Sequence, residues 1–125
     1  MLNSEKIEKD LVELLAIIYN RVPWGKMNTR HNTHDIFNHR VRAASRRENL
    51  FQFVSKLCNY FGLQSLPADS IPVIERLRQN EEYVLNKVYD EHIPLCVMAF
   101  VRAKELKKIK NKNQLTFNLE ELKND

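Results

Sequence analysis

Glycine is scarce in this 125-residue chain, which holds only two glycines and four prolines. Because these residues punctuate turns and hairpins, their scarcity favours long uninterrupted helices over sheets. The two cysteines, Cys58 and Cys96, lie far apart inside helical apolar patterns and form no CxxC pair. We therefore expect buried free thiols in a reducing compartment rather than a disulfide framework.

Long apolar runs are also missing, because no stretch approaches the roughly 18 residues that a membrane span needs. The N-terminal segment carries Glu5, Glu8 and Asp10, whereas a secretory signal peptide begins with basic residues. These two absences predict a cytoplasmic protein that has no membrane partner.

Signatures of catalysis are absent as well. The chain has no glycine-rich phosphate loop, no nucleophile elbow and no outstanding carboxylate pair. Arg30 precedes His34 by three intervening residues and His39 by eight, and neither spacing matches the Arg–His motif of HEPN-type nucleases. His31, His34 and His39 are spread over a loop and more than one helical turn, without the companion motifs of a zinc site. We expect a protein that is not an enzyme and that holds no metal or cofactor.

Hydrophobic periodicity predicts an all-α, single-domain bundle of about five helices over residues 1–125. A first helix is expected over 4–22, capped by Ser4 and ended by Pro23. A second should run from Asn32 or Thr33 to Phe61, with a candidate break near Ser45. Its second half shows one apolar stripe made of Leu50, Phe51, Val54, Leu57, Cys58 and Phe61.

The C-terminal half of the chain predicts further helices. Gly62 should supply a left-handed cap to the preceding helix. A short helix should follow Asp69 or Ser70, and another should open at Asn80. Pro94 should kink that helix or start a new one after Asp90.

Residues 94–103 are apolar nearly all round, which predicts the most buried helix of the bundle. The tail, 111–125, has a polar and finally acidic setting. We expect it to fold back on the bundle or to dock on a neighbouring subunit, because a free tail would expose four large apolar side chains: Leu115, Phe117, Leu119 and Leu122.

Positive charge is concentrated between residues 21 and 47. This segment holds seven Lys and Arg against one acid, Asp35, so its excess of six exceeds the +4 of the whole chain. Such self-repulsion indicates an anionic partner, and a phosphate backbone is the commonest one for a surface of Arg, His, Asn and aromatic residues. The candidate contacts in this segment are Lys26, Arg30, Arg40, Arg42, Arg46 and Arg47.

Two interpretations of these arginines remain open. Arg40 and Arg47 fall on or beside the face that buries further along the helix, whereas Arg42 and Arg46 are four apart and share another face. They could bind an anion, or they could snorkel across the bundle edge to internal acids. Trp24 is similarly ambiguous, since it could stack a base or plug the end of the bundle.

A second basic cluster follows the apolar run at 94–103. It holds six cations against Glu105 alone, and Lys107 and Lys108 are the members that would extend a phosphate-binding track. The alternative is a solvated helix end, where cations stabilise the helix dipole. The cluster consists of Arg102, Lys104, Lys107, Lys108, Lys110 and Lys112.

The segments RVRAASRRENLFQFVSKLCNYFGL and EHIPLCVMAFVRAKELKKIK read as basic and apolar helices. In architecture and charge the whole chain resembles the small helical subunits of CRISPR–Cas effector complexes of the Cascade type. That resemblance implies a non-enzymatic subunit in antiviral defence, which packs along a larger ribonucleoprotein and contacts an RNA–DNA hybrid or a displaced single strand. The candidate contact residues come from the charge pattern and not from the resemblance.

Two other functions are compatible with the sequence. A protein–protein adaptor, such as an antitoxin or a phage-encoded inhibitor, would use the basic segment to bind an acidic partner. A helix-turn-helix regulator of duplex DNA needs a short turn between its helices, and the loop at 23–33 is long for that turn.

Overall fold

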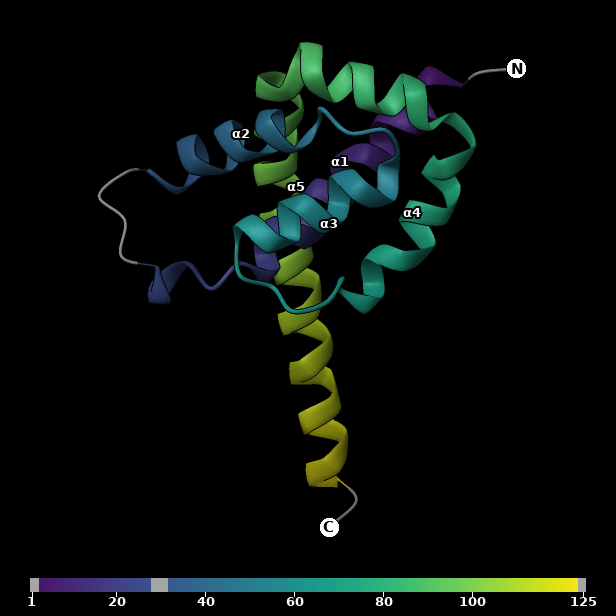
Figure 1. Ribbon diagram of the computed structural model, residues 1–125. Coiled ribbons are helices and arrows are strands. Elements are labelled where there is room, and N and C mark those ends of the chain that lie inside the picture. Colours follow the sequence, from purple (N-terminus) through teal and green to yellow (C-terminus); the bar gives the residue numbers. More distant parts are fainter. Residues whose placement is uncertain (1–2, 28–31, 124–125) are drawn as a thin grey trace.

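The computed structural model describes the backbone of residues 3–27 and 32–123, and the side chains of these residues up to position 111. Figure 1 shows an assembly of helices, and no strand occurs in the described ranges. The prediction of an all-α, single-domain fold is confirmed. The helices are α1 (Ser4–Arg21), α2 (Thr33–Ala44), α3 (Leu50–Tyr60), α4 (Ile71–Leu77) and α5 (Glu81–Lys123).

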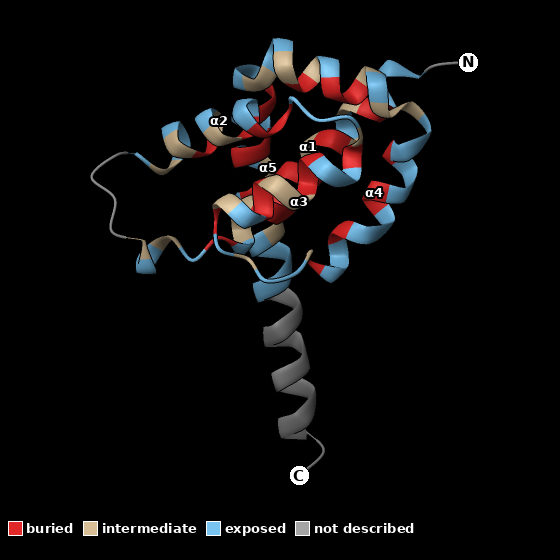
Figure 2. Ribbon diagram, viewed as in Figure 1, coloured by how far each residue is buried: buried red, intermediate tan, exposed pale blue. Residues whose placement is uncertain are grey.

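Helix α1 passes through the middle of the bundle, where its buried face packs against α5 and α4. The apolar spacing predicted this face correctly, since Leu11, Leu14 and Ile18 are fully buried. Asn3, not Ser4, caps the helix, and its Oδ1 accepts a hydrogen bond from the Lys6 backbone N–H at 3.1 Å. Figure 2 shows that the buried residues gather where α1, α3 and α5 meet.

The predicted second helix is divided at the candidate break. Helix α2 ends at Ala44, and the buried Ser45 donates its hydroxyl proton to the Arg42 carbonyl at 2.6 Å. Asn49 then caps α3 by accepting from the Gln52 backbone N–H at 2.9 Å. A polar turn therefore separates α2 from α3, and it carries Arg46 and Arg47.

Helix α3 ends as its sequence predicts. Gly62 has a φ of 72°, and the Leu63 N–H donates to the Cys58 carbonyl at 3.0 Å. These are features of a Schellman cap, in which glycine adopts the left-handed conformation without strain.

The predicted stripe of α3 is wrong at one position, because Phe51 is 59% exposed whereas Phe53 is fully buried. By helical spacing, both rings lie at the edges of the stripe that runs through Leu50 and Val54. Periodicity therefore does not separate them, and the packing of neighbouring helices decides which ring enters the core.

Helix α5 changes direction at Glu91, which has non-helical φ and ψ of −127° and 31°. Pro94 explains this kink, because its ring lacks an N–H and clashes with the carbonyl four residues earlier. The prediction that residues 94–103 form the most buried helix is wrong for one face. Leu95 and Cys96 are buried, but Val97 and Val101 are more than half exposed, since α5 is covered mainly by α1 and α2.

Within the described residues, no helix has both the length and the apolar character that a membrane crossing needs. The predicted docking tail, 111–125, begins inside α5. Because its four large apolar side chains lie outside those described, its docking stays a prediction.

Candidate nucleic-acid interface

Among the residues that the structure describes, the arginines outside the α2–α3 segment are paired with carboxylates. The arginines of the α2–α3 segment differ, because they make no ion pair with any residue that the structure describes. They are Arg40, Arg42, Arg46 and Arg47. Arginines without a carboxylate partner are therefore concentrated around the end of α2. The paired arginines are Arg21 with Asp69 at 3.4 Å, Arg76 with Asp10 at 3.2 Å, Arg78 with Glu75 at 3.5 Å, and Arg102 with Glu13 at 2.6 Å and Glu105 at 2.9 Å.

Arg42 and Arg46 converge on Tyr89, which lies on the first part of α5. The Nη2 of Arg42 donates to the Tyr89 hydroxyl oxygen at 3.4 Å, and the Nη2 of Arg46 donates to the same oxygen. The two guanidinium carbons lie 5.0 and 4.9 Å from the centroid of the Tyr89 ring, within cation–π range. We call Arg42, Arg46 and Tyr89 the arginine–tyrosine cluster.

Two side chains in or beside this cluster, Tyr89 and His92, have lowered pKa values. The hydrogen bond from Arg46, followed by the charge of Arg46, lowers the pKa of the Tyr89 phenol, because both stabilise the phenolate. The pKa of the neighbouring His92 is also lowered, first by burial and then by the positive charge of Arg42. His39 on α2 makes a further, smaller contribution that lowers the pKa of His92.

The local sequence explains how two arginines reach one ring. The break after Ala44 puts Arg46 in a turn, while Arg42 remains in the last turn of α2. Their spacing of four keeps them on one side of the chain. The first part of α5 crosses the end of α2 there, and it contributes Tyr89.

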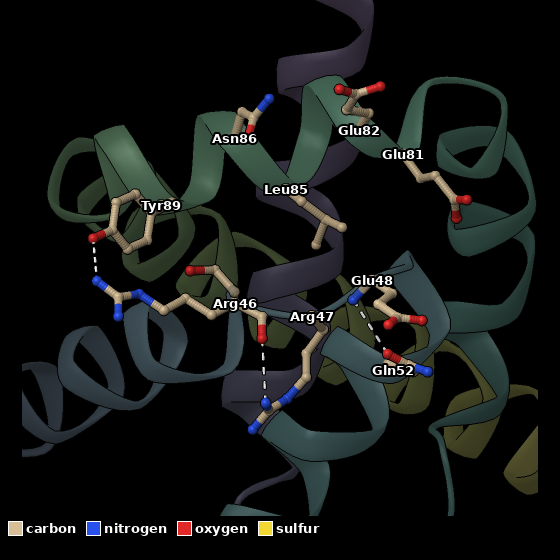
Figure 3. Close-up of a pocket in the computed structure, with 10 residues that line it drawn as sticks. Arg46, Arg47, Glu48, Gln52, Glu81, Glu82, Leu85, Asn86 and Tyr89 are labelled. Carbon is tan, nitrogen blue, oxygen red and sulfur yellow. Dashed lines mark hydrogen bonds between the residues drawn. The ribbon is translucent and has the colours of Figure 1, made fainter.

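A hollow of about 1010 Å³ adjoins the cluster, and Arg47 and Glu48 form part of its lining. Figure 3 shows Arg46 reaching Tyr89 at one end of this hollow, with Glu81 and Glu82 toward the other. One of the acids has a structural task, because Glu81 Oε2 accepts the Leu50 backbone N–H at 3.2 Å. The hollow is therefore mixed in charge, and an anion is favoured only at its arginine end.

Arg40 lies apart from the cluster. Its Nη1 donates to the Tyr60 carbonyl at 2.8 Å, and its guanidinium carbon lies 4.9 Å from the centroid of Phe61. This arginine snorkels across the bundle edge, but it reaches a backbone carbonyl and a ring instead of an acid. It stabilises the C-terminal end of α3, where backbone carbonyls lack helical partners.

The remaining predicted contacts are dispersed. Lys26 is exposed on the 3-10 turn Trp24–Lys26, and Arg30 lies outside the described residues. Lys107 lines a different hollow, of about 1020 Å³, together with Asp10 and Glu13. Lys108 is exposed on α5 and lies 16 residues beyond His92, the neighbour of the arginine–tyrosine cluster. Sixteen residues correspond to about 24 Å along a helix.

Trp24 and His34 make contacts with other side chains of the bundle. Trp24 packs 5.2 Å from Tyr19 between ring centroids, and its Nε1 donates to the Tyr19 carbonyl at 3.1 Å, as expected of a residue that plugs the bundle. The ring of His34 stacks on Phe100 at 3.8 Å. In the described part of the chain, no three His, Cys, Asp or Glu side chains gather closely enough to hold a metal ion, and His31 lies outside it.

Tyr89 is the functional candidate that the sequence did not reveal. It is 43 residues from Arg46 along the chain, and no motif marks it. Only the tertiary packing of α5 on α2 connects the two.

Comparisons with known proteins found no matching family model, no matching curated protein and no matching solved structure. The functional argument therefore depends on the residues of this chain.

Proposed function

We propose that this chain is a non-catalytic, nucleic-acid-binding small subunit of a larger ribonucleoprotein, and that the arginine–tyrosine cluster contacts the phosphate backbone. The observation that carries the proposal is the convergence of two exposed guanidinium groups on one phenol, without a carboxylate partner among the described residues. Two adjacent cations without an acid repel each other, and a bound phosphate would compensate that repulsion.

The chemistry of the cluster suits a phosphate. A guanidinium has five N–H donors, and Arg42 and Arg46 each donate one of them to Tyr89. The remaining donors can form paired hydrogen bonds to phosphate oxygens, which is the geometry that arginine favours. The Tyr89 ring holds both groups in place before binding, so less side-chain entropy is lost when the phosphate arrives.

Contacts of this kind are made to the backbone and not to base edges, so binding should show little sequence preference. Arg47 lies next to the cluster, and its Nη1 donates to the Arg46 carbonyl at 3.2 Å. Arg47 would add a third phosphate contact to a nucleic-acid strand that runs along the turn between α2 and α3. The larger assembly is inferred from the resemblance to CRISPR–Cas small subunits.

The test is binding of the purified full chain to labelled single-stranded and duplex RNA and DNA of scrambled sequence, at about 50 and 200 mM salt. Binding that is salt-sensitive and indifferent to sequence supports the proposal. Absence of binding to every probe at the lower salt concentration would refute it.

A protein–protein adaptor is the second candidate, favoured by the mixed charge of the hollow beside Arg46. An acidic protein partner could pair with Arg46 and Arg47 while its own cations meet Glu48 and Glu82. The absorbance ratio at 260 and 280 nm of freshly purified protein separates the two candidates. A raised ratio that falls after a high-salt wash indicates bound nucleic acid, whereas a protein ratio throughout favours the adaptor.

A further inference from the structure

A groove of about 1020 Å³ lies between α1, α4 and α5, and it shares no lining residue with the hollow at the arginine–tyrosine cluster. Each of the three helices contributes an aliphatic side chain to it: Ile17, Val73 and Leu106. Ile17 and Val73 are nearly buried, whereas Ile109, which also lines the groove, is 49% exposed. The groove therefore offers apolar surface to a partner, and we call it the α1–α4–α5 groove.

The three acids that line this groove are each paired with an arginine. The pairs connect α1 to α4, to α5 and to the turn before α4. They are Asp10 with Arg76 at 3.2 Å, Glu13 with Arg102 at 2.6 Å, and Asp69 with Arg21 at 3.4 Å. Negative charge in the groove is thus already compensated within the chain.

The four lysines that line the groove have no such partner. Lys6 and Lys9 come from α1, and Lys107 and Lys110 come from α5. All four are exposed, and none makes an ion pair with a residue that the structure describes. Their charge favours an anionic partner.

The two pairs of lysines lie toward opposite ends of α1. Lys6 and Lys9 are in its first half. Near its other end, Asn20 donates to the Ala103 carbonyl at 2.9 Å, and the lysines of α5 follow that contact by four and seven residues. From Lys6 to Asn20, α1 rises by about 21 Å. The groove therefore has positive charge toward both ends, and Ile17 lies between them on α1.

We propose that the α1–α4–α5 groove binds an acidic amphipathic helix of a protein partner. The apolar face of that helix packs on Ile17, Leu106 and Ile109, and carboxylates in its first and last turns pair with the two pairs of lysines. A groove of about 21 Å takes about four helical turns.

The lining favours such a helix over a nucleic-acid strand. Proteins that bind single strands stack bases on aromatic rings, and no aromatic side chain is among the described residues that line the groove. Aliphatic side chains instead match the apolar anchors of a helix. The proposal holds whether or not the arginine–tyrosine cluster binds nucleic acid, because the two sites share no residue.

The test uses a labelled synthetic peptide of about 15 residues, which is the length of four helical turns. It carries leucines on one helical face, glutamates in its first and last turns, and alanine and glutamine elsewhere. Fluorescence anisotropy follows its binding to the purified full chain after high salt and nuclease have removed nucleic acid. We expect saturable binding in the micromolar range. A peptide of the same composition, with its leucines scattered around the helix, should bind several-fold more weakly.

Charge reversal at one end of the groove tests the lysines. Lys107→Glu/Lys110→Glu should weaken peptide binding about tenfold, because two attractions become two repulsions. Lys104→Glu/Lys108→Glu is the matched control, since it makes the same change at two exposed lysines of α5 that do not line the groove. The control should bind the peptide within about twofold of the wild type.

The apolar contact is tested in the same way. Ile109→Glu should weaken peptide binding several-fold, whereas Val101→Glu should not, because Val101 is 57% exposed on α5 but does not line the groove. Far-ultraviolet circular dichroism checks that each variant keeps its helix content. The cluster variant Arg42→Ala/Arg46→Ala should bind the peptide like the wild type, which separates failure of this proposal from failure of the nucleic-acid proposal.

Three results would overturn the proposal. One is the absence of saturable peptide binding, and another is an equal loss of binding in the groove and control variants. The third is the loss of single-strand oligonucleotide binding in Lys107→Glu/Lys110→Glu but not in its control, without any peptide binding. That result would assign the groove to nucleic acid.

Discussion

The salt dependence of nucleic-acid binding gives a quantitative test of the arginine–tyrosine cluster. Each phosphate contact on a single strand contributes about 0.7 to the slope of log affinity against log salt. If Arg42 and Arg46 each contact one phosphate, the double variant Arg42→Ala/Arg46→Ala should lose about 1.4 from that slope. Between about 50 and 200 mM salt, this difference amounts to about sevenfold in relative affinity.

The assay is fluorescence anisotropy of a labelled single strand at a series of salt concentrations. The matched control is Arg21→Ala/Arg78→Ala, which removes the same charge from two exposed arginines that already pair with Asp69 and Glu75. The control should keep the wild-type slope apart from a small uniform loss of affinity. An unchanged slope in the cluster variant, or an equal loss in both variants, would show that the cluster does not bind phosphate.

Three further outcomes are expected. Phe53→Ala should lower the free energy of unfolding in urea by about 3–5 kcal/mol, whereas Phe51→Ala should lower it by less than about 0.5 kcal/mol; equal losses would contradict the assigned burial. Burial raises the pKa of the Cys96 thiol to about 12 from an ordinary value of 9.0. Its contribution to stability is therefore fully present below pH 9 and is lost as the pH rises toward 12, by about 1.4 kcal/mol per pH unit; Cys96→Ala should flatten this fall in urea titrations, and an equally steep fall would contradict it. The 295 nm titration of Tyr89 should show a pKa below the ordinary tyrosine value, and Arg46→Ala should raise it, while an unaltered titration would contradict the hydrogen bond.

Much of the fold could be predicted because its boundaries depend on local chemistry. Pro23 ends α1, Gly62 closes α3 in the left-handed conformation, and Pro94 kinks α5, and each effect follows from the backbone of one residue. The burial of Leu11 and Leu14 likewise follows from helical spacing. These features need no knowledge of which helices become neighbours.

Features that depend on helix neighbours could not be predicted. Phe51 and Phe53 are nearly equivalent by spacing, and only the arrangement of the helices distinguishes them. The apolar run at 94–103 gives no sign that one of its faces, including Val97, remains uncovered.

The candidate site was predicted in part. The charge pattern indicated the segment that holds Arg42 and Arg46, and their spacing of four placed them on one face. The sequence could not show that Arg40 donates to the Tyr60 carbonyl, or that Arg42 and Arg46 both donate to the Tyr89 hydroxyl. These contacts join residues that are 20 to 47 positions apart. Sequence therefore predicts where charge accumulates, but tertiary structure decides which cations are free to bind.

The most direct test of the central claim is the location of a bound single strand on the protein, observed by NMR. The chain is titrated with a short oligonucleotide while the guanidinium Nε–H groups and tyrosine ring signals are followed. The account predicts saturable shifts for Arg42, Arg46 and Tyr89, and none for Arg76 and Arg78, which are paired with carboxylates. Shifts confined to other residues, with the cluster unchanged under saturating oligonucleotide, would contradict it.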